Sequence, residues 1–435
     1  MDKKFIKEEV ENKKDKLEGK KPYNKGKKSY KGKSNRENFK RGGDNDVSWY
    51  SRSQQLVLDA AQLSYASILG ARLEKDETDW NDGQTLAIPS VPGIMALRWR
   101  PAVGISRDGY STLNTASTRL YSFIRHANSG SSNYESSDLM LYILAMDSLY
   151  TLHAMGVRAY GISRFYTMKN RYVPDELLLA CGFNPTMQHN LADFRMFLNI
   201  IALKLSSLAV PSEFDLFKRH VWMTSGVYAD SPNEKAQLYV FRPEALWKYN
   251  PIKYETGGAL EPISLVDIDG WSLQEYMNLV NAWISPILSD EDMNIMSGDI
   301  LKAYGNEGVV RVSTIPEDFF IIPEFNMEVL SQIQNATIQQ ISEVTTNHNN
   351  GEIWQDSNKL YFDPAFVVFN GYGNNTYKMI TMSMDNPQPA DTMVATRLST
   401  MLTEQDVEGY RRLDSVGSEY ITHVEIHSRA YQKVG

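Results

Sequence analysis

The sequence predicts a mainly α fold of the α+β class, in which a helix-rich body is followed by a β-containing C-terminal region. Three observations support this prediction. The densest apolar block, residues 139–208, has the spacing of successive helices. The 435 residues are 42% hydrophobic and 23% charged, which is ordinary for a globular chain long enough to bury a sizeable core. After residue 352, short apolar runs alternate with Asn, Gly and Pro turns, as strands do.

The central block begins with the most apolar helix. This helix is expected to cover residues 139–157, to start behind the polar residues 136–138 and to stop at Gly156. Residues 139–146 are uncharged and apolar on every side, so this half should be buried all round. Asp147 near the centre would cost several kcal/mol in a bilayer, which favours a soluble core helix over a membrane span.

Two more helices complete the block. One covers residues 174–181, with Pro174 in its first turn and Gly182 as its stop. The other begins near Asn190 and carries one continuous apolar stripe. The stripe consists of Leu191, Phe194, Leu198, Ile201, Leu205 and Leu208. A helix bundle is the simplest way to bury all three helices.

Further elements flank the block. Helices are expected at residues 51–72, 115–126, 211–226, 289–305 and 327–344. Ser272 and Glu275 form a capping box for another helix, which should end near Ile284 because Pro286 follows. Extended chain is expected at residues 86–101, a weak strand at 309–312, and strands at 361–364, 366–369 and 420–428.

Composition divides the chain into three regions. Residues 1–46 are predicted to be a disordered basic N-terminal arm, because they contain almost no aliphatic side chains. Residues 47–258 form the predicted helical core. Residues 259–435 form a second helical part with the β-containing region, which is expected either to protrude or to decorate the core. Gly257 and Gly258 mark the candidate hinge between the last two regions.

The net charge of −8 is unevenly distributed. Residues 1–46 hold sixteen Lys or Arg and nine Asp or Glu, a balance of +7, so the remaining chain carries −15. A basic arm on an acidic body indicates a polyanionic partner, and Tyr23 and Tyr30 could stack on unpaired RNA bases. A solubilising tail or linker is the alternative. The predicted RNA-binding residues are Lys20, Lys21, Lys25, Lys27, Lys28, Lys31, Lys33, Arg36, Lys40 and Arg41.

Motifs for catalysis or metal binding are not found. The sequence has no G-x-S-x-G elbow, Walker loop, Cys-x-x-Cys pair or H-E-x-x-H motif, and no cofactor is expected. The single cysteine, Cys181, cannot form an intrachain disulfide and is expected to be a buried structural thiol. His423, Glu425 and His427 alternate along a predicted strand, but the outer two would lie roughly 13 Å apart and cannot share one ion. A solvated strand face is therefore expected there.

The sequence is also compatible with an enzyme that uses none of these motifs. Four other histidines could each meet a distant Ser or Asp in the folded chain. They stand at positions 126, 153, 189 and 220.

Two segments of the central block resemble the core of picobirnavirus capsid proteins. They are residues 158–166, Arg-Ala-Tyr-Gly-Ile-Ser-Arg-Phe-Tyr, and residues 171–185, Arg-Tyr-Val-Pro-Asp-Glu-Leu-Leu-Leu-Ala-Cys-Gly-Phe-Asn-Pro. The similarity extends over residues 48–209 and more loosely beyond. The usual member of that family is longer than this chain, which ends at Gly435.

The resemblance implies a capsid (coat) protein. Such proteins form small icosahedral shells from dimers around a segmented double-stranded RNA genome. The resemblance also implies self-cleavage of an N-terminal peptide after assembly, which we place near the boundary between arm and body, although no residue identifies itself as the nucleophile. It implies transient contact with a membrane when the virus enters a cell.

We therefore interpret the chain as a structural protein of the virion that is not an enzyme, assembled in the host cytoplasm. Its expected partners are further copies of itself, as homodimers that build the shell, and viral RNA held by the arm. The alternative is a non-assembling RNA-binding protein with a basic disordered arm. A coat protein should give closed particles, whereas the alternative would stay monomeric or dimeric.

Overall fold

The computed structural model describes most of the chain beyond residue 93. The described residues are 94–128, 134–166, 173–230, 236–254, 257–266, 270–326, 341–343, 350–368, 401–402, 407 and 409–427. All of them belong to one compact unit, Asn45–Gly435. The predicted arm and the helix expected at residues 51–72 lie outside the described residues, so both stay predictions.

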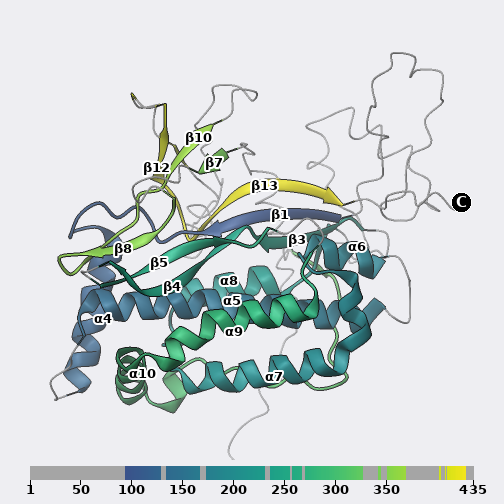
Figure 1. Cartoon of the computed structure of the whole chain (residues 1–435), viewed down its shortest axis with the longest axis horizontal. Helices are drawn as coiled ribbons and strands as arrows, with labels where there is room; N and C mark the ends of the chain where they lie inside the picture. Colours follow the sequence, from purple (N-terminus) through teal and green to yellow (C-terminus); the bar gives the residue numbers. More distant parts are fainter. Residues whose placement is uncertain are drawn as a thin grey trace, which may run out of the picture. The chain divides into compact units, whose positions relative to one another are not determined.

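Helices make up much of this unit (Figure 1). They are α4 (Thr112–Ala127), α5 (Ser136–Tyr166), α6 (Val173–Ala180), α7 (Leu191–Ser207), α8 (Asp215–Ser225), α9 (Leu273–Ser289) and α10 (Glu291–Tyr304), with the 3₁₀-helices η3 (Pro185–Asn190) and η4 (Asn306–Gly308). The predicted mainly α fold of the α+β class is confirmed. Near the predicted positions lie α4, α6, α7, α8 and α10.

The described strands form three sheets. The strands are β1 (Ile94–Pro101), β2 (Tyr228–Ala229), β3 (Leu238–Pro243), β4 (Ala245–Tyr254), β5 (Gly257–Ser264), β6 (Glu324–Phe325), β7 (Ile341–Glu343), β8 (Ile353–Asp356), β9 (Lys359–Tyr361), β10 (Ala365–Val368), β11 (Met401–Leu402), β12 (Arg411–Ser415) and β13 (Glu419–His427). Their orders are β13-β1-β3-β2-β6, β4-β5-β8-β9 and β11-β12-β10-β7. In the first sheet, β1 pairs with β3 in parallel and with β13 in antiparallel orientation.

Helix α5 lies at the centre of the unit. Figure 1 shows the strands β1, β3 and β13 above α5, α8 and α9, with α7 and α10 below these helices. Helix α5 contacts the strands β4 and β5 as well as the helices α4, α6, α7, α8, α9 and α10. Residues 139–146 are all buried, as predicted. A helix that is apolar on every side must be covered by other elements on every side. The expected helix bundle is therefore corrected to a set of helices packed beneath a sheet.

Gly156 does not end α5, which continues to Tyr166. The glycine serves close packing instead: a Cβ at this position would lie 2.7 Å from Leu198 Cδ2 and would also meet the Tyr276 hydroxyl. That hydroxyl donates a hydrogen bond to the Leu152 carbonyl, 2.7 Å away, and so ties α9 to α5. Without a side chain at position 156, both neighbours can approach the helix backbone.

Three other predictions are corrected within the described residues. The capping box of Ser272 and Glu275 is confirmed, but α9 continues through Pro286 to Ser289, because Ile287 beyond the proline is still buried in the core. Residues 309–312 form no strand and make only an isolated bridge between Val309 and Pro211. Residues 341–343, expected in a helix, form strand β7 instead.

Strands also occur earlier in the chain than residue 352. The extended segment expected at residues 86–101 contains β1, and β3, β4 and β5 lie between residues 238 and 264, where no strand was expected from the sequence. Strands β4 and β5 pair with each other on the two sides of residues 255–256, next to the expected hinge at Gly257 and Gly258. The three-region division of the chain stays a prediction.

One helix is long and apolar enough to cross a membrane, by length and composition alone, among the described residues. It corresponds to α5, and 94% of its most apolar window is buried inside the protein. Burial of this kind is a property of core helices, as the sequence predicts for this segment.

Candidate functional site

The ten predicted RNA-binding residues lie outside the described part of the chain. They are Lys20, Lys21, Lys25, Lys27, Lys28, Lys31, Lys33, Arg36, Lys40 and Arg41. Their role stays a prediction. The polar clusters that the structure does describe lie in the body of the protein.

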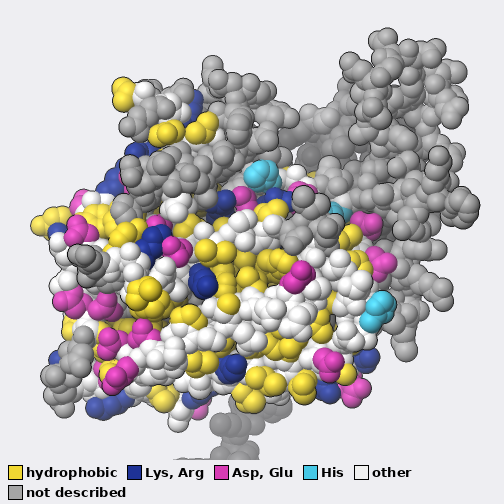
Figure 2. All heavy atoms as spheres, in the orientation of Figure 1, with side chains coloured by type: hydrophobic (Ala, Val, Ile, Leu, Met, Phe, Trp, Pro, Cys, Tyr) yellow, Lys and Arg dark blue, Asp and Glu magenta, His cyan; other side chains and the backbone are white. Residues whose placement is uncertain are grey.

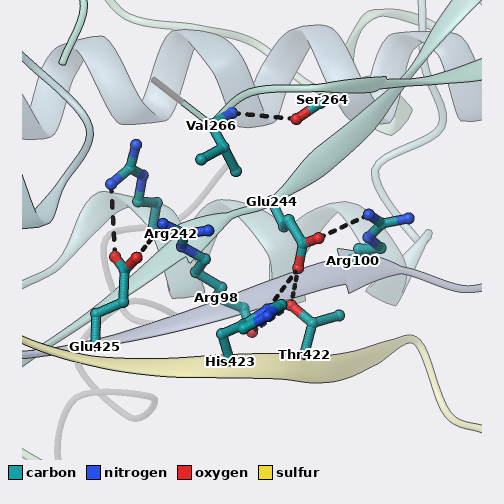
Figure 3. Close-up of polar contacts among 9 residues, drawn as sticks. All are labelled: Arg98, Arg100, Arg242, Glu244, Ser264, Val266, Thr422, His423 and Glu425. Atoms are coloured by element: carbon teal, nitrogen blue, oxygen red, sulfur yellow. Dashed lines mark hydrogen bonds and ion pairs between the residues drawn. The ribbon is translucent and has the colours of Figure 1, made fainter. Parts of the chain in front are cut away.

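One face of the sheet formed by β1, β3 and β13 carries a group of polar and charged side chains (Figure 3). Along β1, Leu97 and Trp99 are fully buried and alternate with Arg98 and Arg100. Because side chains alternate along a strand, both arginines point to the face opposite the buried pair. Arg98 is paired in register with Arg242 on β3 and with His423 on β13. We call the group the sheet-face cluster; it consists of Arg98, Arg100, Arg242, Glu244, Thr422, His423, Glu425 and His427.

Glu425 lies between two arginines of the sheet-face cluster. Its Oε1 accepts a hydrogen bond from Arg98, and its Oε2 lies 3.6 Å from Arg242 Nη1 and 3.5 Å from His427 Nε2. Burial alone would raise the pKa of Glu425, but the nearby His427 ring, the charge and hydrogen bond of Arg98 and the charge of Arg242 outweigh burial and lower the pKa to about 2. The ionised carboxylate therefore connects β13 to both β1 and β3.

Glu244 makes a second connection at the end of β3. Its Oε1 accepts a hydrogen bond of 2.7 Å from Arg100 Nη2, and its Oε2 lies 3.2 Å from His423 Nδ1 and accepts a hydrogen bond from the Thr422 hydroxyl. Burial would raise the pKa of Glu244, but these hydrogen bonds and the charge of Arg100 lower it to about 2. This carboxylate again joins β1 to β13.

A second set of charges lies inside the protein at the start of β13. Glu419 Oε1 accepts hydrogen bonds of 2.9 Å and 2.7 Å from Arg219 Nε and Nη2, and both side chains are at most 4% exposed. His220 Nδ1 lies 2.6 Å from Asp147 Oδ2, and its Nε2 lies 3.0 Å from the Ser418 carbonyl oxygen. We call these five residues the buried anchor. They join α5 and α8 to the first residues of β13.

The surroundings of His220 favour its protonated, positively charged form. Burial would lower its pKa, but the charge of Asp147 and the hydrogen bond to it outweigh burial and raise the pKa above the usual value. When it is protonated, the ring donates through both nitrogens, to the Asp147 carboxylate and to the Ser418 carbonyl.

The buried anchor resembles part of a hydrolytic triad but lacks its chemistry. In a triad, the second ring nitrogen of the histidine takes a proton from a nucleophile. In His220 that nitrogen faces the carbonyl oxygen of Ser418, which has no proton to give. Cys181 is fully buried, and burial raises the pKa of its thiol, so the reactive thiolate is disfavoured. Within the described ranges, no group of three His, Cys, Asp or Glu side chains could hold a metal ion.

The expected solvated face of β13 is corrected by the sheet-face cluster. His423, Glu425 and His427 are half-buried, because Arg98 on β1, Arg242 on β3 and Glu244 just after β3 cover and pair with them. The three β13 residues stand out in the sequence by their alternation, but their partners do not. The alternation of Arg98 and Arg100 with apolar neighbours was a usable signal for one strand. The pairing of β1 with β3 could not be predicted from the sequence of either strand.

Comparison with known proteins decides the family. The sequence profile of the picobirnavirus capsid protein family matches residues 49–409, which is most of the chain. The chain belongs to the picobirnavirus capsid protein family. The capsid protein precursor of human picobirnavirus is 32% identical over 385 residues, which cover 82% of this chain and 69% of that protein. Family membership gives this capsid protein a viral capsid role and confirms the resemblance found in the central block.

A solved structure shows the same fold. The crystal structure of the picobirnavirus capsid is similar to this capsid protein with a TM-score of 0.69 and 21% sequence identity, over 89% of this chain and 81% of that one. In this setting, the sheet-face cluster and the buried anchor are structural features. They hold the strand β13, far along the chain, against β1 and the helices beneath.

Proposed function

We propose that this capsid protein assembles through dimers into a closed icosahedral shell that packages a segmented double-stranded RNA genome. The observation that carries the proposal is the match to the capsid protein family over residues 49–409. The matched region begins just after the basic arm, so the body supplies the shell and the arm is left to contact RNA. The shell is part of the virion, is built in the host cytoplasm and makes transient contact with a membrane when the virus enters a cell.

The charge distribution supports the proposed role of the arm. Residues 1–46 carry +7, whereas the rest of the chain carries −15. The acidic body is repelled by phosphates, so RNA should be held mainly by the arm. Lysine contacts to phosphates release bound cations, and the affinity of the arm for RNA should therefore fall as the salt concentration rises.

The name of the human picobirnavirus relative contains the word precursor. We extend this to the present chain as a proposal: an N-terminal peptide is removed near residue 46, after assembly and by self-cleavage. Mass spectrometry of purified particles tests this, because intact particles carrying only the full-length chain would contradict it.

The proposed function is tested by purifying the full-length protein for negative-stain electron microscopy and recording the absorbance ratio at 260 and 280 nm on the same fraction. Uniform closed shells that carry nucleic acid are expected. Small species alone, over a range of salt and protein concentrations, would contradict assembly and favour the non-assembling RNA-binding protein.

The arm is tested by neutralising five lysines together. Replacing Lys25, Lys27, Lys28, Lys31 and Lys33 with Gln should lower the nucleic-acid content of the shells, because these lysines lie in the stretch with the least acidic charge. The matched control changes an equal number of lysines in the part of the arm that also holds most of its acidic residues: Lys3, Lys4, Lys7, Lys13 and Lys14. Equal RNA content in the two variants would contradict a specific role for the stretch from residue 20 to 41.

A further inference from the structure

Helix α7 has an exposed face that is apolar, which is unusual for a helix at the surface of a soluble protein. Met196, Ile200 and Leu203 are 60%, 43% and 65% exposed. The opposite side of the same helix, with Phe194, Leu198, Ile201 and Leu205, is buried in the core. Figure 2 shows hydrophobic side chains exposed along the lower edge of the molecule, where α7 runs in Figure 1.

The spacing of the three residues is that of a helix-pairing seam. Met196, Ile200 and Leu203 are separated by four and then three residues, which is the alternation of the apolar positions in a coiled coil. At a rise of 1.5 Å per residue they extend over roughly 10 Å along one line of the helix. The seam is therefore shaped to receive another helix.

One side of α7 is already occupied by its own chain. Asn199 bonds to both the N–H and the carbonyl of Ile315, and Ser206 contacts the backbone of Val312. These contacts cover the side of the helix that carries Asn199 and Ser206. They leave the face with the apolar seam exposed.

We propose that α7 packs against α7 of a second copy of this chain, antiparallel, across a two-fold axis. The inference rests on the proposed assembly and names one of its contacts. A two-fold contact uses the same patch twice, so the patch must be complementary to itself. In the antiparallel register centred on residue 198, Met196 lies opposite Ile200 of the second copy and Ile200 lies opposite its Met196.

Charges at the two ends of the seam fit this register. Asp193 is exposed near one end, and Lys204 is half-buried near the other. In the antiparallel pair, Asp193 reaches the layer that contains Leu203 and Lys204 of the second copy, and the symmetry repeats the contact at the other end. Neither charge forms an ion pair with a described residue of its own chain. A parallel pair would instead place Asp193 against Asp193 and Lys204 against Lys204, which is repulsive.

The apolar seam is smaller than a complete interface. Stable interfaces usually involve about 20 to 30 residues on each side. The α7 contact is therefore the apolar centre of a larger surface between two subunits, and it gives that surface its register.

Thiol cross-linking tests the register directly. The double variant M196C/I200C places introduced thiols opposite each other across the two-fold axis and should give covalent dimers under mild oxidation. The single variants M196C and I200C should give much less dimer, because in this register each thiol faces a Met or an Ile. The native Cys181 is fully buried and does not interfere.

Charge exchange tests the ends of the seam. D193K and K204D should each weaken dimer formation about tenfold, because in a two-fold dimer one substitution alters two charge pairs. The double variant D193K/K204D should recover most of the loss. The control K218D reverses an exposed charge on α8 and should leave dimerisation as in the wild type.

The outcome separates this inference from the proposed function. If wild-type protein forms shells, and L203D forms them as readily as the control L301D on α10, the α7 contact is wrong while the capsid role stands. Lack of cross-linking in M196C/I200C within intact shells would also overturn it. If the wild type forms no shells at all, the proposed assembly fails, and cross-linking in solution still decides whether α7 pairs.

Discussion

At the scale of single residues, His220 links the stability of the fold to pH. Its pKa is raised above the value of about 6.5 that a free histidine has, mainly by Asp147 against the effect of burial. A group whose pKa is raised on folding contributes its full stabilisation below the unfolded pKa and loses it as the pH rises through the folded pKa. The buried anchor should therefore be strongest in mildly acidic solution.

The expected result is a free energy of unfolding that falls as the pH rises above about 6.5, by at most about 1.4 kcal/mol per pH unit for this one group. Urea unfolding of unassembled protein between about pH 6 and pH 9 measures the slope. The variant His220→Gln cannot titrate and should show a shallower slope. If His220→Gln keeps the wild-type slope, the anchor does not titrate in this range.

At the scale of elements, Gly156 shows how close packing decides the course of α5. Gly156→Ala should destabilise the protein by about 1–3 kcal/mol, because the new methyl group displaces the Tyr276 hydroxyl and weakens its hydrogen bond to Leu152. The value is the net change: overpacking and the weakened hydrogen bond together outweigh the gain in helix propensity, which is about 1 kcal/mol. Thermal melting measures the change.

A matched control lies in α10. Gly298 is also helical, but a Cβ there would meet nothing within 4 Å. Gly298→Ala should therefore stabilise the protein by about 0.5–1 kcal/mol. Adding Tyr276→Phe to Gly156→Ala should recover part of the lost stability, and equal melting temperatures for the two glycine variants would contradict the packing argument.

Elements with local start and stop signals could be predicted from the sequence. Helix α7 was found from its apolar stripe, and α9 from the capping box of Ser272 and Glu275. Gly156 and Pro286 were misread as stops, since local signals carry no information about the residues that pack around them. Tyr276 of α9 and Leu198 of α7 come from distant parts of the chain and pack against Gly156, so this glycine is a contact site within α5 and not the end of the helix.

At the scale of the whole molecule, long-range pairing was the part that the sequence could not show. Arg98 and Arg242 are far apart in the chain, yet both bind Glu425 on β13. The sequence of each segment predicts only an extended strand, and several other strands could satisfy its backbone hydrogen bonds equally well. The RNA-binding role of the arm rests on its charge alone and stays a prediction, since phosphate binding by lysines depends on composition more than on geometry.

The position of β13 leads to a prediction for the whole chain. Glu419 and Glu425 on this strand balance the charges of Arg219, Arg98 and Arg242. Removing the strand would leave the buried guanidinium of Arg219 without the Glu419 carboxylate, at a cost of about 3–5 kcal/mol. It would also expose the edge of β1, and the total stability of a typical protein is only about 5–15 kcal/mol.

A chain that ends at Ser418 should therefore be insoluble or unfolded, whereas a chain that ends at Ala430 keeps all these contacts and should fold. Soluble yield and the cooperativity of thermal melting, followed by circular dichroism, compare the two truncations. Glu419→Gln isolates the buried pair: it retains the strand and should lower the melting temperature without abolishing cooperative unfolding. A chain ending at Ser418 that melts cooperatively at the wild-type temperature would show that β13 is dispensable, and that neither the Arg219–Glu419 pair nor the contacts of Glu425 stabilise the fold.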